Sequence, residues 1–121
     1  MEFNDNKPIY LQIADQITGD LERGYKRDGD RLPSVREYAA SVGVNANTVM
    51  RTYSWLQQEG IIYNQRGIGF FYSEGAGKRV REMMKKKFFS SELPALLERL
   101  SLFGITPDEF VKLYQEYLNN K

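Results

Sequence analysis

The amino-acid sequence predicts a mainly α-helical fold with one small β-hairpin. Two short amphipathic helical patterns lie within residues 34–59 and are joined by a tight turn at residues 43–45. Two apolar, strand-like runs follow directly, separated by a polar segment with glycines. This order is typical of a winged helix-turn-helix, whose second helix enters the DNA major groove. We therefore predict a winged helix-turn-helix domain over residues 1–74 and a short helical dimerisation segment over residues 75–121.

The composition is that of an ordinary globular protein. Of the 121 residues, 41% are hydrophobic and 27% charged, which suits one domain with a small appendage. No apolar run approaches the roughly eighteen residues of a membrane span, and the start of the sequence lacks the layout of a signal peptide. The sequence therefore predicts a cytoplasmic protein that does not associate with a membrane.

The sequence contains neither cysteine nor histidine. Disulfides and thiolate ligands are therefore excluded, and so is the side chain that most often acts as a general base near neutral pH. The acidic residues are scattered, and Gly67-Ile68-Gly69 lacks the third glycine of a dinucleotide-binding fingerprint. These observations predict a protein that is not an enzyme and that uses no metal or cofactor.

The net charge of +1 hides an uneven distribution along the chain. Residues 31–66 carry four arginines against two glutamates, and residues 76–90 carry six basic side chains against one acidic. The parts of the chain on either side of these two regions are net acidic. Attraction to phosphate acts through local patches, so the pattern favours a nucleic-acid partner despite the small total.

Residues 8–23 predict the first helix. Pro8 suits the first helical position, and apolar side chains recur every four residues until Gly24 ends the helix. We interpret this element as a packing helix with no chemical role. After a turn at residues 28–30, residues 31–32 suit a very short strand.

The second predicted helix begins after Ser34 and ends at Gly43. Ser34 is the expected N-cap, and Glu37 three residues later completes a capping box. Either capping alone, or capping together with a DNA phosphate contact, would explain the Ser34 hydroxyl at this position.

The third predicted helix follows Asn45 and runs to residue 59. With 100° per residue, Val49 shares the core face with Tyr53 and Leu56. The side chains on the opposite face are Asn47, Arg51 and Ser54. Amide, guanidinium and hydroxyl groups read base edges, so this helix is the expected DNA-reading helix. The alternative is a solvated polar face without a ligand.

The hairpin pattern shifts the balance towards DNA binding. Residues 61–63 and 70–72 are apolar strand-like runs, and a polar turn lies between them. Arg66 lies at the tip, where a wing would reach a minor groove or a phosphate, and Gly67 permits a close backbone approach.

Residues 74–77 are small and suit a flexible linker, after which three helical patterns follow. The first covers residues 78–89, and the second covers residues 91–103 with Ser91 as its expected cap. Pro94 would then lie in the first turn; if the two helices were continuous, it would produce a kink. Thr106 is the expected cap of the last helix.

These three helices are too short to close a core, yet their faces are strongly apolar. They must pack on the first domain or pair with a second copy, and we favour pairing because helix-turn-helix proteins bind paired half-sites as two-fold dimers. A small-molecule pocket would need about 300 Å³, which three short helices hardly enclose. Lys85, Lys86 and Lys87 form either a solvated face or a contact to flanking DNA phosphates.

Several motifs in residues 8–72 resemble the GntR family of bacterial transcription regulators. The motifs are Pro8-Ile9-Tyr10-x-Gln12-Ile13, Gly29-Asp30-Arg31-Leu32-Pro33-Ser34-Val35-Arg36-Glu37, Val44-Asn45-x-Asn47-Thr48-Val49, Tyr53-x-x-Leu56, Glu59-Gly60-x-Ile62 and Arg66-Gly67-x-Gly69. The Leu-Pro-Ser-x-Arg block and the Asn-Thr-Val helix start are the specific ones. The short C-terminal part resembles the YtrA subfamily, in which a small helical dimerisation segment replaces the usual effector domain.

The resemblance implies DNA contacts on two helices and in the wing, at Arg36, Thr48, Arg66 and Gly67. Ala46 and Met50 stand where many members outside the subfamily have arginine, so a different base sequence is expected. Members of the subfamily often repress neighbouring genes for ABC-type membrane transporters.

We therefore predict a sequence-specific DNA-binding transcription regulator, a repressor that binds a palindromic operator as a homodimer. The residues expected to contact double-stranded DNA are Ser34, Arg36, Asn47, Thr48, Arg51, Ser54, Arg66 and Gly67. The alternative is a winged-helix module that docks onto other proteins and shows no salt-dependent binding to duplex DNA. No residue pattern identifies a small-molecule effector.

Overall fold

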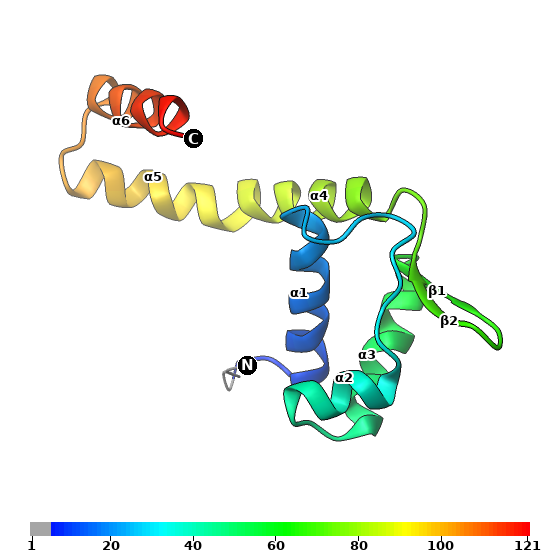
Figure 1. The fold of residues 1–121 in the computed structure, drawn as a ribbon. Coiled ribbons are helices and arrows are strands. Elements are labelled where there is room, and N and C mark those ends of the chain that lie inside the picture. The colour runs from blue at the N-terminus through cyan, green and yellow to red at the C-terminus, as the bar shows by residue number, and fades with distance from the viewer. Residues whose placement is uncertain (1–5) are drawn as a thin grey trace. The chain divides into compact units, whose positions relative to one another are not determined.

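The structure of the protein is a computed structural model, which describes residues 6–121; the start of the domain expected over residues 1–74 lies outside them. In chain order the elements are α1 (Ile9–Glu22), α2 (Val35–Val42), α3 (Ala46–Gln58), β1 (Ile62–Gln65), β2 (Gly69–Tyr72), α4 (Ala76–Lys87), a π-helical turn (Phe88–Glu92), α5 (Leu93–Leu102) and α6 (Pro107–Asn119) (Figure 1). The predicted fold class, mainly helical with one small hairpin, is confirmed.

The described chain divides into two compact units, and the boundary between them along the sequence falls within α4. The first extends as far as Met84, and the second is Lys85–Lys121. The first unit contains the helix-turn-helix, the hairpin and the first turns of α4. The second contains the end of α4 and the two helices after it.

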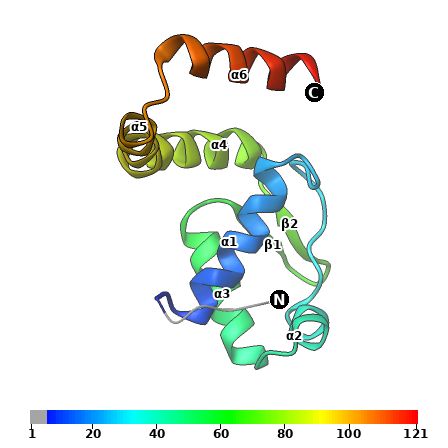
Figure 2. The ribbon, with the colours of Figure 1, turned by 90° about the vertical axis from the view of Figure 1, so that its left-hand side faces the viewer.

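The core of the first unit lies between α1 and α3, and Figure 2 shows α1 crossing in front of α3. The three apolar residues expected on the core face of α3, Val49, Tyr53 and Leu56, are all 0% exposed. The buried apolar side chains of the core are Ile13, Ala14, Ile17, Leu21, Leu32, Ala39, Val49, Tyr53, Leu56, Ile61, Ile62, Tyr72, Ala76 and Val80. The helical periodicity therefore identified the buried face of α3.

The ends of α2 and α3 are capped as the sequence predicts. The Glu37 N–H donates to the Ser34 hydroxyl at 3.1 Å, and the Ser34 N–H donates to the Glu37 carboxylate at 3.0 Å. Gly43 follows α2 in the left-handed conformation, with φ of 72°. The Asn45 side chain accepts the Asn47 N–H at 2.7 Å and so begins α3.

The two strands pair antiparallel, from Ile62 opposite Tyr72 to Gln65 opposite Gly69. Arg31 adds a single bridge to Phe71, and the Leu32 N–H donates to the Phe70 carbonyl at 2.9 Å. The short strand expected at residues 31–32 is therefore a one-residue extension of the sheet.

Polar groups within the core are paired. The Tyr53 hydroxyl donates to the Pro33 carbonyl at 2.7 Å, which ties α3 to the segment that enters α2. The Thr52 hydroxyl donates to the Tyr10 carbonyl at 2.7 Å, which ties α3 to α1. Burial raises the pKa of Tyr53, so its hydroxyl is protonated at neutral pH and can donate this hydrogen bond.

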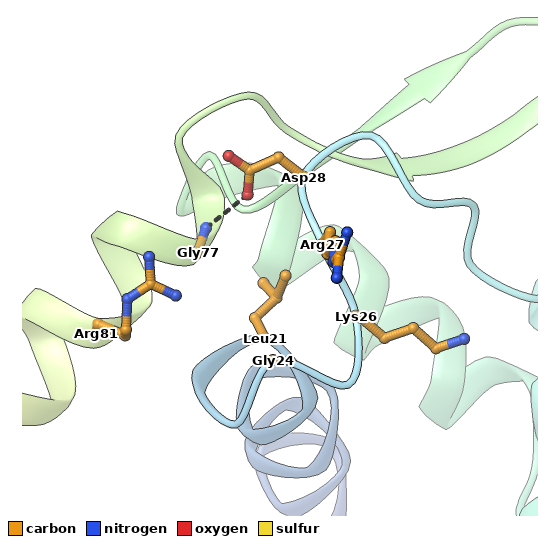
Figure 3. A pocket seen from close by; sticks show the side chains of 7 residues that line it. All are labelled: Leu21, Gly24, Lys26, Arg27, Asp28, Gly77 and Arg81. Atoms are coloured by element: carbon orange, nitrogen blue, oxygen red, sulfur yellow. Dashed lines mark hydrogen bonds between the residues drawn. The ribbon is translucent and has the colours of Figure 1, made fainter.

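The linker expected at residues 74–77 is shorter than predicted, because α4 already begins at Ala76. The Asp28 carboxylate accepts the N–H groups of Gly75 at 2.7 Å and Gly77 at 2.9 Å. An acceptor from the loop after α1 thus caps α4, and burial of Ala76 and Val80 fixes the first turns of this helix on the core. Figure 3 shows Asp28 directed at the Gly77 N–H.

Asp28→Asn is expected to lower the thermal stability at neutral pH. The N–H groups of Gly77 and Gly75 hold the pKa of Asp28 below its usual range. This stabilisation is fully present above the ordinary carboxyl pKa of about 4 and is lost as the pH falls through the lowered value. We expect the Tm to fall by a few degrees at pH 7 and the difference from the unsubstituted protein to disappear well below pH 4.

Thermal unfolding followed by circular dichroism across pH 2–8 would measure this effect. Glu22→Gln removes a carboxylate from the exposed side of α1 and serves as the control. Equal Tm values for Asp28→Asn and Glu22→Gln at pH 7 would contradict a capping role for Asp28.

Of the two alternatives left open for residues 78–103, a helix boundary capped by Ser91 is wrong, and the two helices are continuous. The helical chain continues from α4 through the π-helical turn, where the Leu93 N–H donates to the Phe88 carbonyl five residues back. The Ser91 hydroxyl donates to the Lys87 carbonyl at 3.0 Å and does not cap α5. Pro94 lies in the first turn of α5. Since proline crowds the preceding helical turn, the wider π-helical turn just before it relieves this conflict.

The second unit exposes the apolar faces of its helices. No residue of α5 or α6 is buried, and Leu102 and Tyr117 are 75% and 63% exposed. Thr106 and Glu109 form the predicted capping box at the start of α6. Within the described residues, no helix is long and apolar enough to cross a membrane.

Candidate nucleic-acid interface

Helices α2 and α3 and the turn of the hairpin carry the side chains expected to contact DNA. Ser34 and Arg36 belong to the start of α2, Asn47, Thr48, Arg51 and Ser54 belong to α3, and Arg66 and Gly67 belong to the turn between β1 and β2. Thr48 is half-buried and the other seven are exposed. All eight lie in the first unit, so one folded body presents them to the solvent.

The outer face of α3 is polar and solvent-exposed, opposite its buried stripe. Asn47, Arg51 and Ser54 are exposed there, as the angular spacing predicts. Met50, which is 40% exposed, lies between this face and the core. The helix thus offers amide, guanidinium and hydroxyl groups to the edges of bases, and one apolar side chain that suits a thymine methyl group.

Arg51 does not extend freely into solvent. Its guanidinium carbon lies 4.1 Å from the centre of the Tyr10 ring, in the first turns of α1. The same residues border an open groove of about 370 Å³, which is lined by Pro8, Ile9, Tyr10, Asn47, Thr48 and Arg51. The structure therefore brings three of the expected DNA-contacting residues together with the start of α1. The interpretation of α1 as a packing helix alone did not include this contact.

Ser34 acts as the cap of α2. Its hydroxyl accepts the Glu37 N–H, and the Ser34 N–H donates to the Glu37 carboxylate and lowers the pKa of that group. Glu37 is therefore anionic at neutral pH and remains engaged at the helix start. The Ser34 hydroxyl also donates to the Glu37 carboxylate and contributes to the lowered pKa of that group. A phosphate contact from Ser34 remains a prediction.

The turn of the wing is held by Arg31, a residue outside the predicted DNA contacts. The Arg31 guanidinium donates to the Ile68 carbonyl at 2.7 Å and so holds the turn that carries Arg66. Gly69 makes room for it, because a Cβ at this position would lie 3.0 Å from Arg31 Nε. Arg31 could have been suspected from its place in the short strand beside the hairpin.

Arg79 of α4, which is not among the predicted DNA contacts, binds the C-terminal end of α3. The Arg79 guanidinium donates to the carbonyls of Glu59 and Gly60, both at 3.1 Å. These groups terminate α3, where a helix has unpaired carbonyls and attracts positive charge. One arginine of the basic stretch at residues 76–90 therefore has a structural role.

A second open pocket, of about 470 Å³, lies where the loop after α1 meets α4 (Figure 3). Its lining includes the cationic side chains of Lys26, Arg27 and Arg81 around Asp28. The Asp28 carboxylate already occupies the N–H groups at the start of α4, so it takes the place that another anion would use. Within residues 6–121, no group of three or more acidic side chains is placed to hold a metal ion.

A known protein family matches the part of the chain that contains all eight residues expected to contact DNA. Residues 9–71 match the family described as "Bacterial regulatory proteins, gntR family". The chain is 40% identical over 111 residues to the uncharacterized HTH-type transcriptional regulator YhcF of Bacillus subtilis, a match that covers 92% of this chain and 90% of YhcF. It is 46% identical over 69 residues to the HTH-type transcriptional repressor YtrA of Bacillus subtilis, covering 57% of this chain and 53% of YtrA.

A solved structure shows the same likeness. The crystal structure of a GntR-family transcriptional regulator from Bacteroides thetaiotaomicron is 45% identical in sequence, with a TM-score of 0.72. The match covers 92% of this chain and 97% of that one, so it extends beyond the DNA-binding domain. The matched family and the named relatives are regulators of transcription. The chain belongs to the gntR family of bacterial regulatory proteins and is a DNA-binding transcription regulator with a winged-helix fold.

Proposed function

We propose that this chain is a transcriptional repressor that binds a palindromic operator as a homodimer in the cytoplasm. The observation that carries the proposal is the division of roles between the two units. The first unit presents basic and polar side chains on α2, α3 and the wing. The second unit presents apolar helix faces that its own chain does not bury.

In the proposed complex α3 lies in the major groove. Asn47 and Arg51 suit bidentate contacts to adenine and guanine, which contribute about 1–3 kcal/mol of discrimination each. Arg36, Thr48 and Ser54 support the same surface. Ser34 adds a phosphate contact, and Arg66 enters a minor groove while the Gly67 backbone approaches the DNA closely.

The homodimer is proposed from the exposed apolar side chains of the second unit. On α6 they recur at helical spacing, at Phe110, Val111, Leu113, Tyr114, Tyr117 and Leu118. A continuous apolar face of this kind is costly in water and marks an interaction surface. A second copy offers the same face, and two-fold pairing would present two reading helices to two half-sites.

Repression is proposed from the likeness to YtrA, which is named a repressor and is 46% identical over the DNA-binding part. A dimer that covers an operator within a promoter would exclude the transcription machinery. The chain needs no cofactor for this role, since shape, charge and hydrogen bonding carry the recognition.

Selection of bound sequences from a random pool of duplex DNA would test the proposal. We expect an enriched inverted repeat whose half-sites lie about one helical turn apart, centre to centre, and an affinity that falls steeply with salt. Arg36→Ala should weaken binding to the selected operator. Recovery of no enriched sequence, together with salt-independent binding to proteins, would instead favour a docking module.

A further inference from the structure

The contact between Tyr10 and Arg51 assigns a function to the start of α1. The guanidinium carbon of Arg51 lies 4.1 Å from the ring centre of Tyr10, well inside the range for a cation stacked on an aromatic face. Arg51 is exposed and Tyr10 is half-buried. One partner is thus anchored in the protein, while the other faces the solvent on the side of α3 expected to read DNA.

A hydrogen bond from α3 fixes the backbone of Tyr10. The Thr52 hydroxyl, on the residue after Arg51, donates to the Tyr10 carbonyl at 2.7 Å. Thr52 is 0% exposed, so this hydrogen bond lies within the packed junction of α1 and α3. The backbone that carries the aromatic ring is therefore fixed relative to the backbone that carries the arginine.

Stacking leaves the hydrogen-bonding edge of the arginine available. The guanidinium carbon of Arg51 lies over the Tyr10 ring, and a guanidinium stacked on an aromatic face keeps its five N–H donors directed outward in its own plane. An unrestrained arginine loses much rotamer freedom when it binds a base, and a pre-positioned one loses less. The aromatic ring would therefore strengthen a base contact without touching DNA itself.

The pair also lies among other residues of the interface. Tyr10 and Arg51 border the same groove as Asn47 and Thr48. A side chain held at this edge of α3 would reach the DNA beside the base pairs that Asn47 contacts.

We propose that Tyr10 is a positioning residue, which orients Arg51 for recognition of one guanine in each half-site. This inference rests on the proposed function, since it needs a selected operator. It gives α1 a part in DNA recognition in addition to its part in the core.

A double-mutant cycle between Tyr10→Leu and Arg51→Ala would test this role. Affinities are measured for the selected operator and for operators altered at single base pairs. Tyr10→Leu should weaken operator binding about two- to fivefold, the range expected for an exposed cation–aromatic contact. Tyr10→Leu should reduce discrimination between bases at one operator position only, the position at which Arg51→Ala also reduces it. In the Arg51→Ala background, Tyr10→Leu should cause no further loss.

The control variants separate stacking from packing. Tyr10→Phe keeps the ring and should bind like the unsubstituted protein. Tyr25→Leu removes another aromatic ring that lies under an arginine, Arg23, at 5.6 Å; Tyr25 does not line the groove, so this variant should not change operator affinity. Tyr10→Met, which has no ring but an apolar side chain of similar length, gives the same measurement if Tyr10→Leu does not fold.

Additive losses in the cycle, or equal losses for Tyr10→Phe and Tyr10→Leu, would overturn the role of Tyr10. In that case the unsubstituted protein still binds its selected operator, and the proposed function stands. Failure of the unsubstituted protein to select any operator would overturn the proposed function, and this inference with it.

Discussion

Replacement of Leu113 and Tyr117 by aspartate is expected to leave a monomer that binds the palindromic operator about 100- to 10,000-fold more weakly. Both side chains lie on the apolar face of α6 and are 57% and 63% exposed in the single chain. Dimerisation would bury the two carboxylates away from water with no positively charged group beside them. This burial is unfavourable and prevents association. Each chain would then bind one half-site alone and lose the second binding event that the dimer makes intramolecular.

Sedimentation velocity and operator titration would measure this effect. Lys112→Asp introduces the same charge on the polar side of α6 and should leave a dimer with unchanged operator affinity. The double variant and the unsubstituted protein should bind DNA that contains a single half-site with equal affinity per DNA-binding unit. Equal affinity would show that the substitutions leave the DNA-binding surface intact. A double variant that remains dimeric would contradict pairing through α6.

Tyr53→Ala is expected to lower the free energy of unfolding by about 3–5 kcal/mol, as large aromatic truncations in cores do. Tyr53 is 0% exposed, packs edge-on against Phe70 at 4.9 Å between ring centres, and donates to the Pro33 carbonyl. Truncation therefore opens a cavity between α3 and the hairpin and leaves that carbonyl unpaired. Because small domains have only about 5–15 kcal/mol of stability, the loss is a large part of the total.

Urea unfolding followed by the fluorescence of Trp55, the single tryptophan, would measure this loss of stability. The same measurement on a second variant separates the contribution of ring packing from that of the hydroxyl hydrogen bond. Tyr53→Phe keeps the ring and removes only the hydroxyl, so it should cost about 1 kcal/mol, the usual net value of one hydrogen bond. Similar losses for the two variants would mean that the hydrogen bond, and not the packing of the ring, dominates at this position.

The helices, their caps and the hairpin were predictable because each depends on residues close together in the chain. Ser34 and Glu37 form their capping box across a single helical turn, and Asn45 caps α3 through an N–H two residues away. The stripe of Val49, Tyr53 and Leu56 is buried because helical spacing alone brings these residues to one face. The boundary at Ser91 was wrong for an equally local reason: the chain accommodates Pro94 by widening a turn instead of ending the helix.

The candidate interface was predictable in the same limited sense. Angular spacing identified Asn47, Arg51 and Ser54 as the outer face of α3, and this face is exposed. It could not show that Arg51 stacks on Tyr10, because the contact depends on how α1 crosses α3. Spacing within one helix carries no information on a neighbouring helix.

The sequence by itself determined the order of the elements, their buried faces and the family motifs of the DNA-binding domain. Only the tertiary structure decided which distant groups complete it: Asp28 caps α4, Arg31 holds the wing and Arg79 closes the end of α3. Each of these hydrogen bonds joins residues 19 to 49 positions apart. Helical periodicity and capping rules act over a few residues, whereas such contacts form only when packing of the core has brought the elements together.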